Sequence, residues 1–260
     1  MTPVPLAYKF VAIAVMLAEI NHSASRLQLP VDLPIKESDV KIATVSNPHV
    51  ITRVRNLPIE HGFAGGINTE KYSFNFIASG RLRYITRLDG GYQAFSTTKV
   101  QGDLPTSDYL PQLAGIQSVI DTNGAYRLAT NWLVAMDVDV QRLEKEQAVT
   151  VKQEFGKGSA PLPIFEVRWG VGRIDNLGHP KSAAVDVMIA GDTKDLLHLR
   201  QNDDSYSKRP FVLIKDMDKL LAIPDEEFLK YSPMERSNLV ARFAAVVYPV
   251  TTNAPTEDRK

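Results

Sequence analysis

The chain lacks cysteine, an excess of charge of either sign, and any hydrophobic run long enough to cross a membrane. Its 260 residues include no cysteine, which excludes disulfides, thiolate metal sites, iron–sulfur clusters and cysteine nucleophiles. The 30 lysines and arginines balance the 30 aspartates and glutamates, so the formal net charge is zero. Nucleic-acid-binding domains usually carry a basic excess. The composition therefore gives no reason to expect a nucleic-acid partner.

One apolar run near the start of the chain, residues 10–18 (FVAIAVMLA), permits two interpretations. Lys9 precedes it and small residues follow at 23–25, which together outline a secretory signal peptide. Glu19 ends the run early, however, and apolar residues continue at helical spacing as far as Leu27, which favours an amphipathic helix of the fold. Crossing a bilayer takes about 20 apolar residues, so no transmembrane span is predicted.

The cellular compartment follows from that choice and stays open. If the run from Phe10 to Ala18 is the hydrophobic region of a signal, the protein is periplasmic or secreted. If the run belongs to a folded helix, the protein is cytoplasmic. The absence of cysteine does not decide between the two, because exported proteins can also lack disulfides.

Strands dominate the prediction between this helix and residue 88. Enrichment in β-branched residues predicts short strands at 38–46 and 50–55, and HGFAGG at 61–66 is typical of a flexible turn. Residues 71–88 form the clearest hairpin, since apolar and polar residues alternate on both sides of Ser79-Gly80.

The middle of the chain reads as a loop followed by helices. Residues 89–106 are rich in Gly, Thr and Pro, which predicts a loop and a domain boundary. A short helix is predicted at 107–120. Asp121 or Thr122 can cap a longer helix, because their side-chain oxygens accept bonds from unpaired first-turn amides. The apolar stripe of that helix consists of Ala125, Leu128, Ala129, Trp132, Leu133, Met136 and Val140.

The remainder of the chain predicts a second set of strands and then helices. Pro224 opens one short helix, and Ser232 with Glu235 forms a capping box with proline at the first helical position. Residues 251–260 are polar, and we expect them to be disordered. The predicted strands are 148–155, 163–169, 184–190, 195–200 and 211–215.

This order of elements predicts an α+β protein made of two helix-plus-antiparallel-sheet units. The similarity of the two units has two explanations, an internal duplication or the chance likeness of any two hairpins. The hairpin YSFNFIASGRLRYITR can be aligned with VDVMIAGDTKDLLHLR, each ending in an arginine (Arg87 and Arg200). The expected units are 1–100, with the N-terminal helix and hairpin; 101–215, with the second helix and sheet; 216–250, a C-terminal helical extension; and 251–260, a disordered tail.

A helix followed by antiparallel strands, repeated in tandem, resembles the PepSY domain of exported bacterial proteins. The resemblance depends on element order and on the turn Gly191-Asp192-Thr193. Residues 223–246 also look like the ending of uncharacterised bacterial proteins. For this chain, the resemblance implies a binding or inhibitory role and no catalysis.

No pattern in the sequence indicates a cofactor, a metal or a catalytic residue. The five histidines are scattered, without helical i, i+4 spacing or an HExxH motif. Glycines at 170–172 follow a strand as a dinucleotide fingerprint would, but the third glycine is misplaced and a strand comes next. Gly156-Lys-Gly-Ser159 lacks the spacing of a phosphate-binding loop. We therefore predict no catalytic, cofactor or metal residues.

Aromatic, basic and acidic groups each permit a weaker interpretation. Tyr72, Phe74, Phe76 and Trp169 lie at strand spacing and could stack on a sugar or base, although core packing is the stronger account. Arginines at 81, 83 and 87 could form a small anion-binding patch. The aspartate pairs 137/139, 203/204 and 216/218 do not continue as calcium loops and are expected to be solvated.

Three functional hypotheses remain. The first is a non-enzymatic, exported binding or structural protein of bacteria with a protein or peptide partner. The second is an unrecognised hydrolase whose site is assembled from loops 61–66, 156–160 and 170–180, with His61 or His179 beside an acid. The third is a subunit of a cell-envelope assembly that uses the first helix as its contact.

Overall fold

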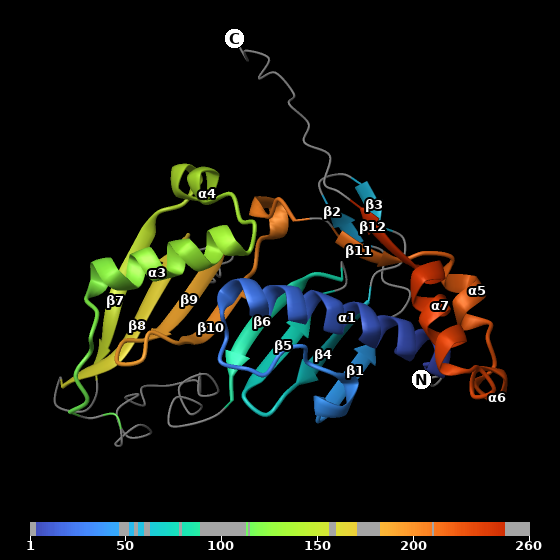
Figure 1. Cartoon of the computed structure of the whole chain (residues 1–260). Coiled ribbons are helices and arrows are strands. Elements are labelled where there is room, and N and C mark those ends of the chain that lie inside the picture. Colours follow the sequence, from blue (N-terminus) through green and yellow to red (C-terminus); the bar gives the residue numbers. More distant parts are fainter. Residues whose placement is uncertain are drawn as a thin grey trace, which may run out of the picture.

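The protein is an α+β fold in which helices lie on one face of a large antiparallel sheet (Figure 1). A computed structural model describes residues 4–46, 52–54, 57–59, 63–77, 80–88, 113, 115–155, 160–170, 183–209 and 211–247. The predicted α+β class is confirmed. The predicted loop at 89–106 and the predicted disordered tail at 251–260 lie outside these residues.

The sheet has eight strands in the order β1-β4-β5-β6-β10-β9-β8-β7. In chain order, each half is a helix followed by strands that pair mainly with their neighbours in sequence, and the last strands of the two halves, β6 and β10, pair antiparallel at the centre. The strands are β1 (Ile42–Ser46), β4 (Ala64–Asn68), β5 (Tyr72–Phe76), β6 (Leu82–Arg87), β7 (Val149–Phe155), β8 (Pro161–Trp169), β9 (Val185–Ala190) and β10 (Leu196–Gln201).

Helix α1 (Leu6–Leu27) lies across the first half of the sheet, and α3 (Thr122–Ala135) lies across the second half, on the same face (Figure 1). Between them they cover one continuous hydrophobic core that also includes strand residues from both halves. The predicted units 1–100 and 101–215 thus share one sheet and one core, and their status as separate domains stays a prediction.

The apolar run of residues 10–18 lies within α1 and contributes to this core. Val11, Ala12, Val15 and Met16 are buried, and Phe10 packs on Phe228 with ring centroids 5.6 Å apart. The helical spacing noted in the sequence matches the buried positions, because one face of the helix meets the sheet. Export, and with it the compartment, is not decided by this placement.

Helix α3 begins where the sequence predicts but ends at Ala135, so Val140, the last residue of the predicted stripe, begins the next helix. The Asp121 side chain accepts a hydrogen bond from the Gly124 N–H at 2.7 Å, which identifies Asp121 as the cap. Of the predicted stripe, Leu128 and Trp132 are only partly buried against the core; the rest is buried. A short helix, α4 (Val140–Glu146), follows and leads into β7.

The C-terminal part contains helices α5 (Met217–Leu221), α6 (Asp225–Phe228) and α7 (Pro233–Phe243), which gather beside the N-terminal half of α1 (Figure 1). The predicted capping box at Ser232 and Glu235 is confirmed. The extension is not wholly helical, because β12 (Ala244–Val247) pairs antiparallel with β11 (Phe211–Ile214). β2 (Thr52–Val54) and β3 (Leu57–Ile59) form a further pair.

Two local predictions are wrong. The expected turn at 61–66 becomes strand β4 from Ala64 onward. Its glycines serve close packing and not a turn, because a Cβ on Gly65 would lie 1.9 Å from the Thr44 carbonyl oxygen and 2.8 Å from Met16 Cε. Glycine is needed there for close packing between strands and under α1. The expected helix at 107–120 is absent from the described residues 115–120, which run without regular structure.

A third prediction is partly wrong. Of the strand expected at 38–46, only Ile42–Ser46 is extended, and a 3-10 turn at Glu37–Asp39 precedes it. Asp39 closes that turn by accepting a bond from the Lys36 N–H at 2.8 Å. A polar side chain that bonds its own backbone competes with strand formation.

Candidate functional site

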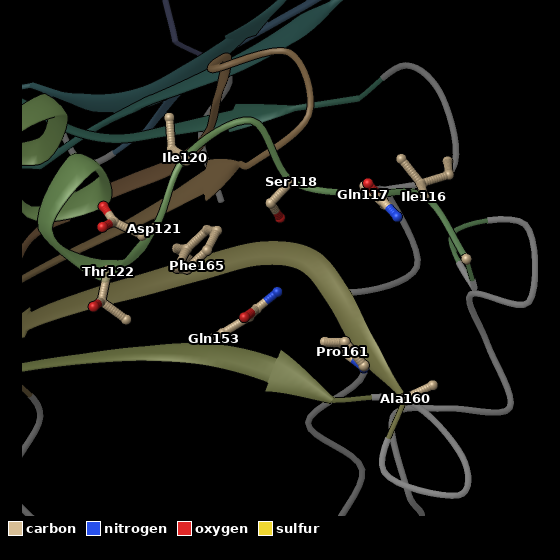
Figure 2. A pocket seen from close by; sticks show the side chains of 11 residues that line it. Ile116, Gln117, Ser118, Ile120, Asp121, Thr122, Gln153, Ala160, Pro161 and Phe165 are labelled. Atoms are coloured by element: carbon tan, nitrogen blue, oxygen red, sulfur yellow. The ribbon is translucent and has the colours of Figure 1, made fainter.

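A cavity of about 650 Å³ lies at the end of the sheet where β7 ends and β8 begins (Figure 2). Its walls are the segment before α3 on one side and the β7–β8 hairpin on the other. Its size falls in the range of small-ligand sites. The lining residues are Gly115, Ile116, Gln117, Ser118, Ile120, Asp121, Thr122, Gln153, Ala160, Pro161 and Phe165.

The backbone of the segment before α3 is fixed to the sheet through Gly191. The Val119 N–H donates to the Gly191 carbonyl at 2.8 Å, and the Gly191 N–H donates to the Pro163 carbonyl at 2.7 Å. A Cβ on Gly191 would lie 2.6 Å from Ser118 Oγ and 2.7 Å from Phe165 Cε2. The absence of a side chain therefore lets this segment approach the sheet and form the cavity wall.

The polar groups of the cavity are neutral apart from Asp121, whose carboxylate caps α3. The Ser118 hydroxyl is buried without a hydrogen-bond partner among the described residues. The Gln153 amide donates to the Leu162 carbonyl at 2.9 Å, and its side chain points toward the Ser118 side of the cavity (Figure 2). No histidine, lysine or arginine lines the described cavity. The described lining thus offers Ser118 no imidazole or amine as a base, and the Asp121 carboxylate accepts the Gly124 N–H.

Exposed apolar side chains lie on the segments that form this cavity. Ile116 is 39% exposed and lines the cavity, Phe155 is 54% exposed opposite Pro161, and Val119 is 63% exposed on the segment before α3. Apolar groups gathered around a polar hollow are typical of a recognition surface.

A second cluster of polar residues lies on the face of the sheet opposite the helices. His198 Nδ1 lies 2.9 Å from Thr86 Oγ1, and His198 Nε2 lies 3.6 Å from Asp186 Oδ1. Asp186 also accepts from Arg200 Nε at 2.7 Å. The threonine, histidine and aspartate resemble a nucleophilic triad in composition, so their surroundings decide what they can do.

Those surroundings do not support acyl transfer. Strand β10, which carries His198, has β6 on one side and β9 on the other, so its main-chain N–H groups are used in the ladder and cannot form an oxyanion hole. The neighbouring Glu166 is likewise paired, with Arg168 at 2.6 Å and Lys152 at 3.0 Å. The pair with Lys152 joins β7 to β8, and cross-strand charge pairs of this kind stabilise a sheet.

A third cluster is a buried ion pair between α1 and the segment that precedes β11. Arg209 Nη1 lies 2.8 Å from Glu19 Oε1 and 2.9 Å from Ser23 Oγ. Burial raises the pKa of the Glu19 carboxyl, and the positive charges of Arg209 and Arg81 oppose that change. Arg81 donates to the Asp204 and Arg209 carbonyls. This cluster connects elements distant in sequence and has no described cavity beside it.

The structure places the remaining predicted groups as follows. Core packing of the aromatic residues is confirmed, because Tyr72, Phe74 and Trp169 are fully buried and Phe76 nearly so. The weaker alternative of an anion-binding patch gains no support, because each of its arginines has a protein partner: Arg83 donates to Asn202, Arg87 pairs with Asp195, and Arg81 bonds the carbonyls named above.

Two of the three aspartate pairs are not simply solvated, whereas Asp216 and Asp218 are exposed as expected. Asp139 caps α4 and Asp203 caps a 3-10 turn, while Asp137 pairs with Arg26. Among the described residues, no group of three or more histidine, aspartate and glutamate side chains could hold a metal ion.

The loops expected to build a hydrolase site begin at different ends of the sheet. Ala160 precedes β8 and lines the cavity, whereas Gly170 follows β8 at its other end, about 33 Å away for an extended chain of ten residue steps. His61, His179 and most of these loops lie outside the described residues, so the hydrolase stays a prediction.

The sequence did not predict the cavity, because its most polar wall lies in the segment that was expected to be helical. The predicted helix cap at Asp121 was the one feature of the sequence that could have indicated a non-helical segment before α3. A cap residue has a non-helical conformation, so the residues just before it were candidates for a surface loop.

Comparison of the chain with protein-family models, with curated proteins and with solved structures finds no match. Within the described part of the chain, none of the helices has the length and apolar character needed to cross a bilayer.

Proposed function

We propose that this chain is a non-enzymatic binding protein that accepts an extended, uncharged peptide segment of a partner protein in the cavity beside α3. The observation that carries the proposal is the combination of an unpartnered Ser118 hydroxyl with the Gln117 and Gln153 amides, in a hollow whose described lining has no imidazole or amine.

The chemistry of the cavity favours a peptide over an anionic ligand. Hydroxyl and amide groups both donate and accept hydrogen bonds, which matches the alternating N–H and C=O groups of an extended backbone. No lysine, arginine or histidine in the described lining could neutralise an anionic ligand. The exposed Ile116 and Phe155 offer apolar contact to a side chain of the peptide.

The proposal is tested with a random peptide library displayed on phage and selected against the immobilised full chain. Gln117→Arg places a charged, longer side chain in the cavity, and Gln141→Arg makes the same change on an exposed position of α4, away from the cavity. We expect enriched peptides to lose about tenfold or more in affinity for Gln117→Arg and to bind Gln141→Arg as they bind the unaltered chain.

Two results would contradict the proposal. One is a selection that yields no binder, or only binders that ignore Gln117→Arg. The other is turnover of a selected peptide that Ser118→Ala abolishes, which would support the hydrolase hypothesis.

Export from a bacterial cell, a PepSY-like origin and membership of an envelope assembly stay predictions. The third of these has little support in the surface of α1, where only Ala18, His22, Ser25 and Arg26 are exposed among the described residues. Lys9, Ile13 and Leu17 on the same helix are half-buried.

A further inference from the structure

We propose that strand β7 is a self-association edge, through which a second copy of this chain pairs antiparallel about a two-fold axis at Gln153. The inference goes beyond the peptide-binding proposal and does not depend on it, because its register follows from the backbone and charges of β7, although the Gln153 side chain also lines the cavity.

The first observation is that β7 is the last strand of the sheet and pairs with β8 alone among the described strands. The Gly170 N–H donates to the Ala148 carbonyl, and in an antiparallel ladder this direction alternates along the strand. Val149, Val151 and Gln153 therefore direct their N–H and C=O groups away from β8, where another strand can bind them.

The second observation is that β7 carries no extra residue where its ladder with β8 shifts, beyond Gln153. The ladder with β8 shifts between Gln153 and Phe155, but β7 advances by two residues there while β8 advances by four, from Phe165 to Pro161. The extra residues belong to β8. Lys152 Nζ also lies 3.0 Å from Glu154 Oε1, so these two side chains occupy the same face. β7 is thus a regular edge through Glu154.

The third observation is the charge pattern of that edge. Pairing about Gln153 sets Lys152 of each copy opposite Glu154 of the other, which gives two favourable cross-strand pairs. Moving the axis to Lys152 would set two lysines opposite each other. An axis between residues would place outward-directed groups opposite inward-directed ones, so the ladder could not form. The charges therefore select the register at Gln153.

The usual role of a lysine on an edge strand is to prevent such pairing by repulsion. That interpretation does not fit β7, because Glu154 follows two residues after Lys152 and makes the edge complementary to itself in the antiparallel direction. The same register brings Val151 opposite the exposed Phe155 of the second copy. A two-fold interface of this kind closes on itself and does not continue into a fibre.

The test is a charge exchange followed by sedimentation velocity of the full chain across a wide concentration range. Lys152→Glu sets glutamates against Glu154 of the second copy, and Glu154→Lys sets lysines against Lys152. We expect the dissociation constant of each variant dimer to be about tenfold or more above that of the unaltered dimer. An equimolar mixture of the two variants should form heterodimers, because every cross-strand pair is then of opposite charge.

Val151→Pro gives a second test that leaves the charges intact. It removes an N–H that faces away from β8, so the β7–β8 ladder keeps its bonds while the edge loses one. We expect a folded monomer, as judged by circular dichroism. The proposal is overturned if the unaltered chain stays monomeric, if it forms open-ended assemblies, if the exchanged charges leave the dimer intact, or if the mixed variants stay apart.

Discussion

Replacing Arg209 with methionine should destabilise the protein strongly at neutral pH, through the carboxylate that it leaves behind. Arg209 bonds both Glu19 and Ser23, and the side chains of the ion pair are only 10% and 11% exposed. Methionine preserves much of the volume but supplies no charge. Breaking a buried pair by removing one partner costs about 3–5 kcal/mol, because the remaining charge is buried and uncompensated. We expect a loss of that size in the free energy of unfolding.

The pH dependence follows from the direction of the Glu19 pKa. Burial raises this pKa, so the folded state favours the protonated carboxyl. The stability that the protonated carboxyl contributes is fully present below the pKa of the unfolded chain, and it is lost as the pH rises through the folded pKa. Without Arg209, the folded pKa rises further. The difference between the unaltered chain and Arg209→Met should therefore be small in acid and grow toward neutral pH.

Urea denaturation at several pH values measures this difference. Arg142→Met is the matched control, since Arg142 forms an exposed i, i+4 pair with Glu146 on α4 and should cost about 0.5 kcal/mol or less. Adding Glu19→Gln to Arg209→Met should restore most of the loss at neutral pH, because no buried charge then remains unpaired. A loss that is independent of pH, or that the second substitution leaves unchanged, would refute the electrostatic reasoning.

Two further predictions concern backbone positions. Gly65→Ala should lower the free energy of unfolding by about 1–3 kcal/mol, because its Cβ would meet the Thr44 carbonyl and Met16 at 1.9 and 2.8 Å; a melting temperature equal to that of the unaltered chain would contradict this. Asp121→Ala should lower the free energy of unfolding by about 1 kcal/mol through loss of the α3 cap, as measured by urea denaturation. Asp121→Asn should restore most of that free energy, because the asparagine oxygen can still accept the Gly124 N–H. If Asp121 acted through its charge alone, Asp121→Asn would restore nothing.

The parts of the fold that the sequence predicts well depend on short-range chemistry. The caps at Asp121 and Ser232 act within three residues, and the hairpin of β5 and β6 depends on alternation between neighbouring strands. In each case the groups that interact are close in sequence, so their residue types are sufficient to identify them.

The parts that the sequence could not predict depend on contacts between distant segments. From its residue type Gly65 resembles a turn residue, and only its packing under Met16 of α1 shows why glycine is needed there. Glu19 and Arg209 are ordinary charged residues until α1 and the segment before β11 meet. The cavity wall is held in place by the Gly191 carbonyl, which accepts a hydrogen bond from the Val119 N–H. Nothing local to these residues specifies the partner, which is why pattern and composition gave no binding residue.

The two halves of the sheet agree in the order of their elements but differ in the face on which the closing arginine of each hairpin lies. Element order agrees, since α1 and α3 each precede an antiparallel array and β6 meets β10 at the centre. The two closing arginines do not agree. Arg87 lies opposite Tyr72 and therefore on the helix-covered face, whereas Arg200 lies opposite Asp186 on the other face. A shift of one residue reverses the face of every side chain in a strand.

The outer edges differ as well, and this difference favours β7 as the edge that self-associates. β1 and β7 occupy opposite ends of the sheet, and a strict repeat would make them equivalent. β1 has five residues and no charged side chain, whereas β7 has seven and carries Lys152 and Glu154 on one face. If charge fixes the register, the β7 edge should pair with itself while β1 should not, and Ile42→Lys on β1 should leave the dimer unchanged in sedimentation. Loss of the dimer in that variant would move the interface to the other end of the sheet.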